Sequence, residues 1–254
     1  MDMNLKGTFL QKWANYFGDV ELPIIFYYSD TANNCEIVPK AESWKCLIGE
    51  LTKVRNGKSL AFSKESIGCM GGKKYSGFQD NLRPNFEYFL SCGNETVKGE
   101  KYLKSPELVK QFLAKAPFKR TDKQFIIFKR WDLMVEMDFP EIVIFYANPD
   151  VLSGLFTISG FDRDFEEGTI TPFGAGCSSL IQYPLSESNK DKPRAVIGLF
   201  DVTARPYVQK DILTFAIPFK RFVELINFFD ESFLTTEAWS KIKKRININK
   251  SNTL

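Results

Sequence analysis

Short apolar runs alternate with helical patterns along this chain, and this alternation is what most constrains its fold. Six runs are rich in apolar, β-branched or aromatic residues, as buried strands are. They are Leu22–Tyr28, Ser59–Phe62, Gln124–Lys129, Glu141–Tyr146, Arg194–Phe200 and Leu213–Ile217. Between them, apolar residues recur every three or four positions, which is typical of amphipathic helices. We therefore expect an α/β or α+β fold in which helices flank a mixed sheet.

Capping signals show where several helices begin and end. Ser105–Pro106 and Asn148–Pro149 each place a capping side chain directly before a proline, a combination that opens helices. The apolar residues from Trp44 to Val54 repeat at helical spacing and stop before Asn56–Gly57. The glycine-rich segment 67–78, IGCMGGKKYSGF, is predicted to be a loop.

The length of the chain, 254 residues, allows one large domain or two small ones, since domains usually contain about 100–200 residues. A hydrophobic share of 44%, with 15% aromatic residues, is enough for a sizeable core. We expect one compact domain over residues 1–254.

The order of elements also suggests an internal duplication. Each half contains a buried strand, a helix that begins near a cysteine, a second strand and a loop with a candidate site residue. The cysteine and the loop residue are Cys46 and Cys69 in the first half, and Cys177 and Arg205 in the second. A true duplication would make the two helix starts face each other across a pseudo-twofold axis, whereas the alternative is chance recurrence of common elements. The predicted halves are residues 20–120 and 121–235.

The chain contains no histidine, and this excludes several classes of mechanism. Neither a Ser-His-Asp triad nor a Cys-His nucleophile pair can form. Zinc sites with histidine ligands and iron sites with two histidines and a carboxylate are excluded as well. Any chemistry must use cysteine, carboxylates, lysine, tyrosine or a bound cofactor.

Three of the five cysteines stand in unusual surroundings. Cys46 and Cys177 lie where helices are predicted to begin, and a helix N-terminus favours the thiolate form. Cys69 and Cys177 lie beside glycines, in IGCMGG and FGAGCSS. We take all three as candidate metal ligands and Cys177 as the candidate nucleophile. Their spacing matches neither zinc ribbons nor ferredoxins, and the alternative is that they are small buried hydrophobic residues.

Five further residues are candidate ligand-binding positions. Glycines let the backbone approach a ligand closely and can form anion-binding concavities, and the guanidinium of an arginine can hold a carboxylate or phosphate through two hydrogen bonds. The candidates are Gly71, Gly72, Gly174, Gly176 and Arg205. The alternative for Arg205 is that it binds carbonyl groups of its own loop.

Charge and cysteine content limit the cell compartments and the kinds of partner that we expect. The formal net charge is +3, with 34 Lys and Arg against 31 Asp and Glu, so we expect no nucleic-acid partner. No apolar run approaches the ~20 residues that a membrane helix needs, and no export signal is visible at the N-terminus. We expect a cytoplasmic protein with reduced cysteines that binds a small molecule or a metal, and we leave its oligomeric state open.

Several motifs, taken in order, resemble the domain of unknown function 169 family, an archaeal and bacterial group. The quoted motifs are IGCMGG, EIVIFYANPDVLSGL, PFGAGCSSLIQYPL, GLFDVTARPYV and LTFAIPFKRF, and the resemblance extends from about Leu22 to Trp239. It implies that the cysteines shared within the family correspond to Cys46, Cys69 and Cys177, and the shared arginine to Arg205.

Three functions remain open at this point. The first is binding of a metal ion, an iron–sulfur cluster or a small thiophilic ligand through the three cysteines, with Arg205 holding an anionic group nearby. The second is an enzyme in which a cysteine acts without a histidine base. The third is a non-catalytic module that binds a small molecule or a partner and in which the cysteines are merely buried.

Overall fold

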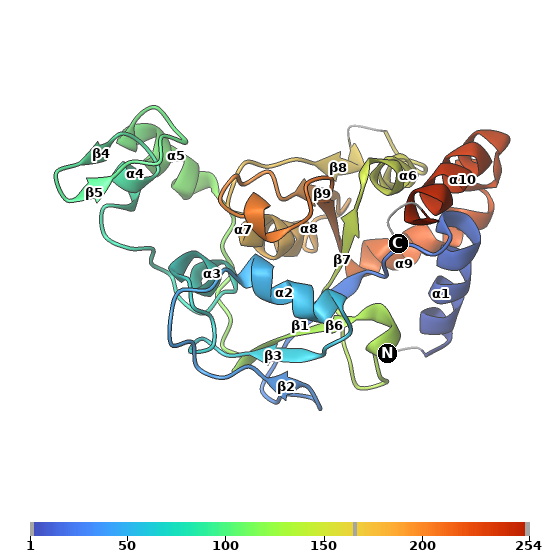
Figure 1. The fold of residues 1–254 in the computed structure, drawn as a ribbon, viewed down its shortest axis with the longest axis horizontal. Coiled ribbons are helices and arrows are strands. Elements are labelled where there is room, and N and C mark those ends of the chain that lie inside the picture. Colours follow the sequence, from blue (N-terminus) through green and yellow to red (C-terminus); the bar gives the residue numbers. More distant parts are fainter. Residues whose placement is uncertain (1–2, 165–166, 252–254) are drawn as a thin grey trace.

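The computed structural model describes residues 3–164 and 167–251, and at its centre lies one eight-stranded mixed sheet (Figure 1). The strand order is β2-β3-β6-β1-β7-β10-β9-β8. The strands are β1 (Ile24–Ser29), β2 (Glu36–Ile37), β3 (Leu60–Phe62), β6 (Phe125–Arg130), β7 (Ile142–Ala147), β8 (Thr169–Ile170), β9 (Ala195–Gly198) and β10 (Leu213–Pro218). The prediction of a mixed sheet with flanking helices is thus confirmed.

Helices cover both faces of the sheet, because successive residues of each strand point to opposite faces. In β1, for example, Ile25 and Tyr27 join one hydrophobic cluster while Ile24 and Phe26 join the other. One face is covered by α1 (Met3–Phe17), α6 (Pro149–Ser159), α9 (Phe219–Asn227) and α10 (Glu237–Ser251). The other is covered by α2 (Leu47–Arg55), α3 (Met70–Tyr75), α7 (Gly176–Leu180) and α8 (Gln182–Glu187).

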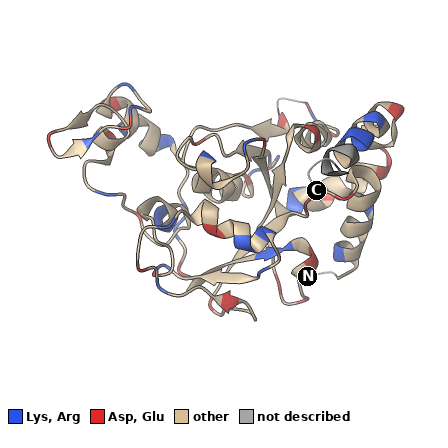
Figure 2. Ribbon diagram, in the orientation of Figure 1, with Lys and Arg blue, Asp and Glu red and all other residues tan. Residues whose placement is uncertain are grey.

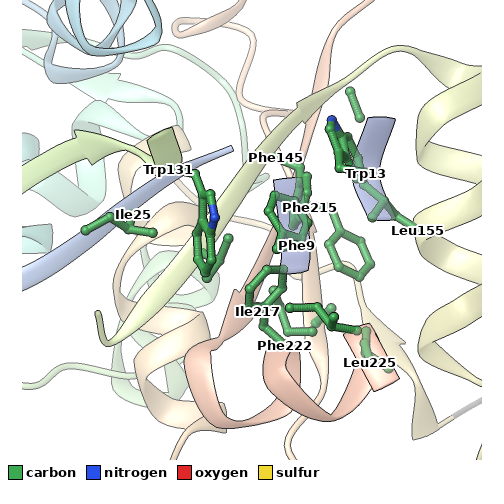
Figure 3. Packing of buried hydrophobic residues seen from close by; sticks show 14 of the residues in the cluster. Phe9, Trp13, Ile25, Trp131, Phe145, Leu155, Phe215, Ile217, Phe222 and Leu225 are labelled. Carbon is green, nitrogen blue, oxygen red and sulfur yellow. The ribbon is translucent and has the colours of Figure 1, made fainter. Parts of the chain in front are cut away.

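The face under α1 and α9 holds a dense aromatic core (Figure 3). Phe9 lies 4.9 Å from Trp131, 5.1 Å from Phe222 and 5.5 Å from Trp13, measured between ring centroids. These rings are almost completely buried. We call this side of the sheet the aromatic face.

A small lobe projects from this body, at the upper left of Figure 1. It consists of α4 (Phe86–Phe89), the β-hairpin β4 (Gly93–Asn94) and β5 (Val97–Lys98), and α5 (Pro106–Lys115). Ser105 caps α5 by accepting a hydrogen bond from the Leu108 N–H, as the Ser-Pro signal predicts. Four single-turn 3₁₀ helices complete the described elements: η1 (Trp131–Leu133), η3 (Arg205–Tyr207), η4 (Phe228–Asp230) and η5 (Phe233–Thr235).

The two halves of the sheet have the same strand order. Reading from the edge inward, the first half is β2-β3-β6-β1 and the second is β8-β9-β10-β7. Each half therefore places its second, third, fourth and first strand along the chain in that order. In each half the outermost pair is parallel and the next two pairs are antiparallel. The halves meet where β1 pairs antiparallel with β7, with Ile25 opposite Val143. A common origin of the two halves stays a prediction, but the arrangement places α2 and α7 on the same face.

One predicted loop is wrong, because residues 70–75 form the short helix α3. Two glycines weaken a helix of this length, but the Cys69 side chain caps it and accepts a hydrogen bond from the Gly72 N–H at 3.2 Å. The helix predicted from Trp44 begins only at Leu47, and Trp44 is exposed outside it.

Charged side chains of both signs are interspersed over the described elements (Figure 2). The absence of a nucleic-acid partner stays a prediction. Within residues 3–164 and 167–251, no helix has the length and apolar composition needed to cross a bilayer.

Candidate functional site

Cys46, Cys69 and Cys177 come from three different elements on one face of the sheet. Cys46 precedes α2 as its N-cap residue, Cys69 precedes α3 in the same way, and Cys177 lies in the first turn of α7. All three belong to or pack against the hydrophobic cluster on this side, which we call the cysteine face. Cys46 and Cys69 are half-buried, whereas Cys177 is buried.

Two of the predicted glycines allow these elements to approach one another closely. A Cβ atom at Gly72 would lie 2.7 Å from the Cys69 sulfur and 3.4 Å from Leu47 Cβ. A Cβ atom at Gly176 would lie 2.9 Å from Ala204 Cβ and 3.4 Å from Ile48 Cγ1. The first turn of α2 therefore contacts both the α3 element and the α7 element, which brings the three cysteine-bearing segments together.

The other two glycines differ from this pair. A Cβ atom at Gly71 would meet nothing within 4 Å, so no close approach requires glycine there. A Cβ atom at Gly174 would lie 2.7 Å from the Ser178 hydroxyl, which belongs to the same turn as Cys177. Binding of a ligand at any of the four glycines stays a prediction.

Burial keeps two of the thiols uncharged. It raises the pKa of Cys177 well above the ordinary range, and nearby charge on Cys69, Cys46 or Asp201 raises it further. Burial also raises the pKa of Cys46, although the backbone N–H groups of Gly49 and Ile48 act in the opposite direction. This is the reverse of the lowered thiol pKa expected at a helix start, because loss of water outweighs the helix N-terminus. Charge on Cys69 would raise the pKa of both Cys46 and Cys177, so these two thiols are electrostatically coupled to the third cysteine.

Asp201 joins the site from the loop after β9. Its carboxylate accepts hydrogen bonds from the Gly176 N–H at 3.0 Å and from the Thr203 N–H and hydroxyl at 3.0 and 2.7 Å. It also accepts a longer one, 3.4 Å, from the Tyr102 hydroxyl. Asp201 thus fixes the start of α7 and places a negative charge near Cys46 and Cys177.

Two tyrosines lie near the cysteines. Burial raises the pKa of the Tyr75 phenol on α3, and nearby charge on Cys177 and Asp201 adds to this rise. Tyr146 on β7 is buried with the Arg55 guanidinium 4.2 Å above its ring, and burial likewise raises its pKa. Charge on Cys46 contributes to the Tyr146 shift, so this phenol lies near the first cysteine. Its hydroxyl has no hydrogen-bond partner in the described part of the chain.

Arg205 makes contacts that match the alternative raised from the sequence. Its terminal guanidinium nitrogens donate to the carbonyl groups of Gln209, Lys210 and Ile212, at 3.2 Å for Gln209 and 2.6 Å for Lys210. These bonds close the loop between β9 and β10. An anionic ligand at Arg205 stays a prediction, and it would have to share a guanidinium that already binds three carbonyls.

The family model of DUF169, described as an uncharacterised ArCR, matches residues 21–227. The chain belongs to the DUF169 family. This confirms the resemblance seen in the motifs, and the matched region includes all three cysteines, Asp201 and Arg205. No curated protein and no solved structure matches the chain.

The cysteine site of this DUF169 protein is not arranged as a closed metal shell. Among residues 3–164 and 167–251, no three Cys, Asp or Glu side chains form a group that could hold a metal ion. Because a Zn–S bond is only ~2.3 Å long, sulfurs that share one ion must lie close together.

Exposed apolar side chains flank the site residues of the DUF169 protein along the sequence. They are Trp44, Met70, Phe173, Phe200 and Tyr207, each within three residues of a cysteine, a predicted glycine, Asp201 or Arg205. The rings of Trp44 and Tyr207 lie 6.0 Å apart, although 163 positions separate them in the sequence. Trp44 and Tyr207 thus form an exposed pair of aromatic rings next to Cys46 and Arg205 in the sequence.

Proposed function

We propose that this DUF169 protein binds a small thiophilic ligand at Cys46, Cys69 and Cys177. One observation carries the proposal: three cysteines that are far apart in the sequence come together from α2, α3 and α7 on one face of the sheet. Thiolate sulfur is a soft donor, and the chain has no histidine that could supply a competing imidazole ligand.

The electrostatics of the site suit a ligand that displaces thiol protons. Cys46 and Cys177 are held as neutral thiols in the free protein, so a soft electrophilic centre must release their protons as it binds. The N–H groups of Ile48 and Gly49 then stabilise negative charge on the Cys46 sulfur. A ligand with a soft metal or metalloid centre has this property.

A nucleophilic enzyme is less well supported, because a reactive cysteine needs a lowered thiol pKa and good access. Cys177, the candidate nucleophile, is buried and its pKa is raised. A purely structural role fits the buried Cys177 better than it fits Cys46 and Cys69. Those two cysteines are half-buried and occupy the N-cap positions of α2 and α3.

The proposal is tested by anaerobic titration with phenylarsine oxide, whose arsenic(III) centre forms two As–S bonds with neighbouring thiols and releases one water. We expect one equivalent to bind tightly. Cys46→Ser and Cys69→Ser should each abolish tight binding, because each leaves the arsenic without one of its two half-buried sulfur partners.

Cys35→Ser and Cys92→Ser are the matched controls, since both remove a free thiol outside this site. Binding that survives a triple Cys46→Ser, Cys69→Ser, Cys177→Ser variant would overturn the proposal, as would equal losses in the controls. Titration with Cd²⁺ then separates ligand types, because a metal held by all three sulfurs loses affinity in every single variant.

A further inference from the structure

Arg83 presents a guanidinium edge that has no hydrogen-bond partner in the part of the chain that the structure describes. The residue lies in the loop between α3 and α4, and its guanidinium stacks 3.6 Å from the centroid of the Phe89 ring. Its Nε and one terminal nitrogen are both buried and have no hydrogen-bond partner within the described residues. Buried N–H donors without acceptors are unfavourable, and charged ones especially so.

Four other arginines of this chain show which group binds to the same guanidinium edge. Each donates from Nε and the same terminal nitrogen to the two oxygens of one carboxylate. The pairs are Arg55–Glu21, Arg130–Asp132, Arg194–Glu187 and Arg245–Asp150. Arg83 offers this two-pronged edge, and no carboxylate of the described chain occupies it.

Arg83 lines a cavity of about 440 Å³, whose other lining residues include Asp80 and Pro84 before the lobe and Leu113 and Phe118 at its end. A second cation, Lys74, also lines it, with its ammonium 4.4 Å from the centroid of the Phe118 ring. The acidic residue in the wall, Asp80, is paired with Arg120 at 2.5 Å. Leu113 and Phe118 supply apolar surface. The cavity lining therefore combines two cations with apolar groups, and its volume suits a small organic molecule.

We propose that this cavity binds a small organic oxyanion, with its carboxylate or phosphate group on the Arg83 edge. Lys74 supplies the second positive charge, and the apolar part of the ligand packs against Leu113 and Phe118. The site is independent of thiophilic binding at the cysteines. Tyr75 connects the two places, because it lines the cavity and lies within electrostatic reach of Cys177.

The test uses three probes of similar shape: benzoate, phenyl phosphate and the neutral benzamide. Calorimetry on the full chain should show binding of one or both anions and none of benzamide, and the comparison of the anions tells carboxylate from phosphate recognition. In ¹⁵N spectra of the arginine side chains, the Arg83 Nε–H signal should move downfield as its hydrogen bond to the anion forms.

Variants distinguish specific anion binding in this cavity from adventitious binding elsewhere. Arg83→Gln should weaken anion binding roughly tenfold or more, since it removes two charge-assisted hydrogen bonds. Arg83→Lys keeps the charge but loses the paired donors, so it should also weaken anion binding. This second variant provides the test if Arg83→Gln folds poorly. Arg245→Gln is the matched control, because its edge is already occupied by Asp150, and it should bind as the wild type does.

Three results would overturn the proposal: no binding of either anion, equal binding of benzamide, or equal affinity in the wild type and both Arg83 variants. In the wild-type protein, absent arsenical binding together with intact anion binding would refute only the cysteine proposal, and the converse only this one.

Discussion

The aromatic face and the cysteine face of the central sheet are packed with different kinds of side chain. On the aromatic face, α1 and α9 pack rings such as Phe9 and Phe222 against the strands with almost no exposure (Figure 3). On the cysteine face, α2, α3 and α7 bring thiols, phenols and a carboxylate together beside exposed apolar side chains. The comparison teaches that one layer is packed with aromatic and aliphatic groups, whereas the other also contains the ionisable side chains that we propose as ligand-binding groups.

The largest expected effect is on the aromatic face. Phe9→Ala should lower the free energy of unfolding by about 3–5 kcal/mol, because it leaves a cavity among packed rings. Urea denaturation measures this. Trp44→Ala removes a larger but exposed ring beside the cysteine face and should change stability by about 0.5 kcal/mol or less. Equal decreases in the free energy of unfolding in the two variants would contradict this difference between the faces.

A second effect concerns the ion pair that anchors α9. Arg221 is buried and donates to the Asp162 carboxylate, at 2.7 Å for one of the two hydrogen bonds. Asp162→Asn should lower the free energy of unfolding by about 2 kcal/mol at pH 7, because charged hydrogen bonds to a buried arginine are lost.

This pair also predicts a pH dependence. The hydrogen bonds from Arg221 hold the pKa of Asp162 below its usual range. The pair therefore stabilises the fold fully above the unfolded pKa of about 3.9, and the contribution disappears as pH falls through the lower folded pKa. The difference between wild type and Asp162→Asn should shrink when denaturation is repeated near pH 3. A difference that grows in acid would contradict the ion pair.

Two neighbouring glycines sharpen the comparison on the cysteine face. Gly72→Ala should destabilise the protein by about 1–3 kcal/mol and weaken arsenical binding, because the new Cβ collides with the Cys69 sulfur. Gly71→Ala adds the same group to the same helix in open space and should stabilise by about 0.5–1 kcal/mol. Thermal unfolding and the arsenical titration distinguish the two. Identical behaviour would mean that Gly72 does not hold the cysteine segments together.

The smallest effect is kinetic. Because burial raises the pKa of Cys46 and Cys177, iodoacetamide should alkylate both more slowly at pH 7 than it alkylates the exposed Cys92. The Cys46 rate should keep rising as pH increases above about 8.5, the ordinary thiol pKa. Mass spectrometry of peptides gives the separate rates. Faster alkylation of Cys177 than of Cys92 would instead favour a nucleophilic role.

Much of the fold follows from local patterns in the sequence. Buried strands such as β1 and β7 could be predicted because nearly all their residues are apolar, and α5 and α6 because a capping residue precedes a proline. The helix α3 could not, since two glycines argue against a helix and the Cys69 cap that offsets them is visible only in three dimensions. The β4–β5 hairpin of the lobe gave no alternating apolar signal.

The site was only partly predictable for the same reason. Glycine contexts and helix starts marked the cysteines, but no sequence signal marked Asp201. Its role depends on the Gly176 N–H, 25 positions away. Arg83 gave no signal either, because its buried edge is created by stacking on Phe89 and by the junction of the lobe.

The central claim is that three distant cysteines line one site, and cross-linking tests it most directly. Dibromobimane joins two thiols only when they are a few ångströms apart, and peptide mass spectrometry identifies the joined pair. The account predicts that native protein yields products joining Cys46 to Cys69 or either of them to Cys177, and that urea abolishes this preference. Products dominated by Cys35 or Cys92, or the same pattern in native and unfolded protein, would contradict it.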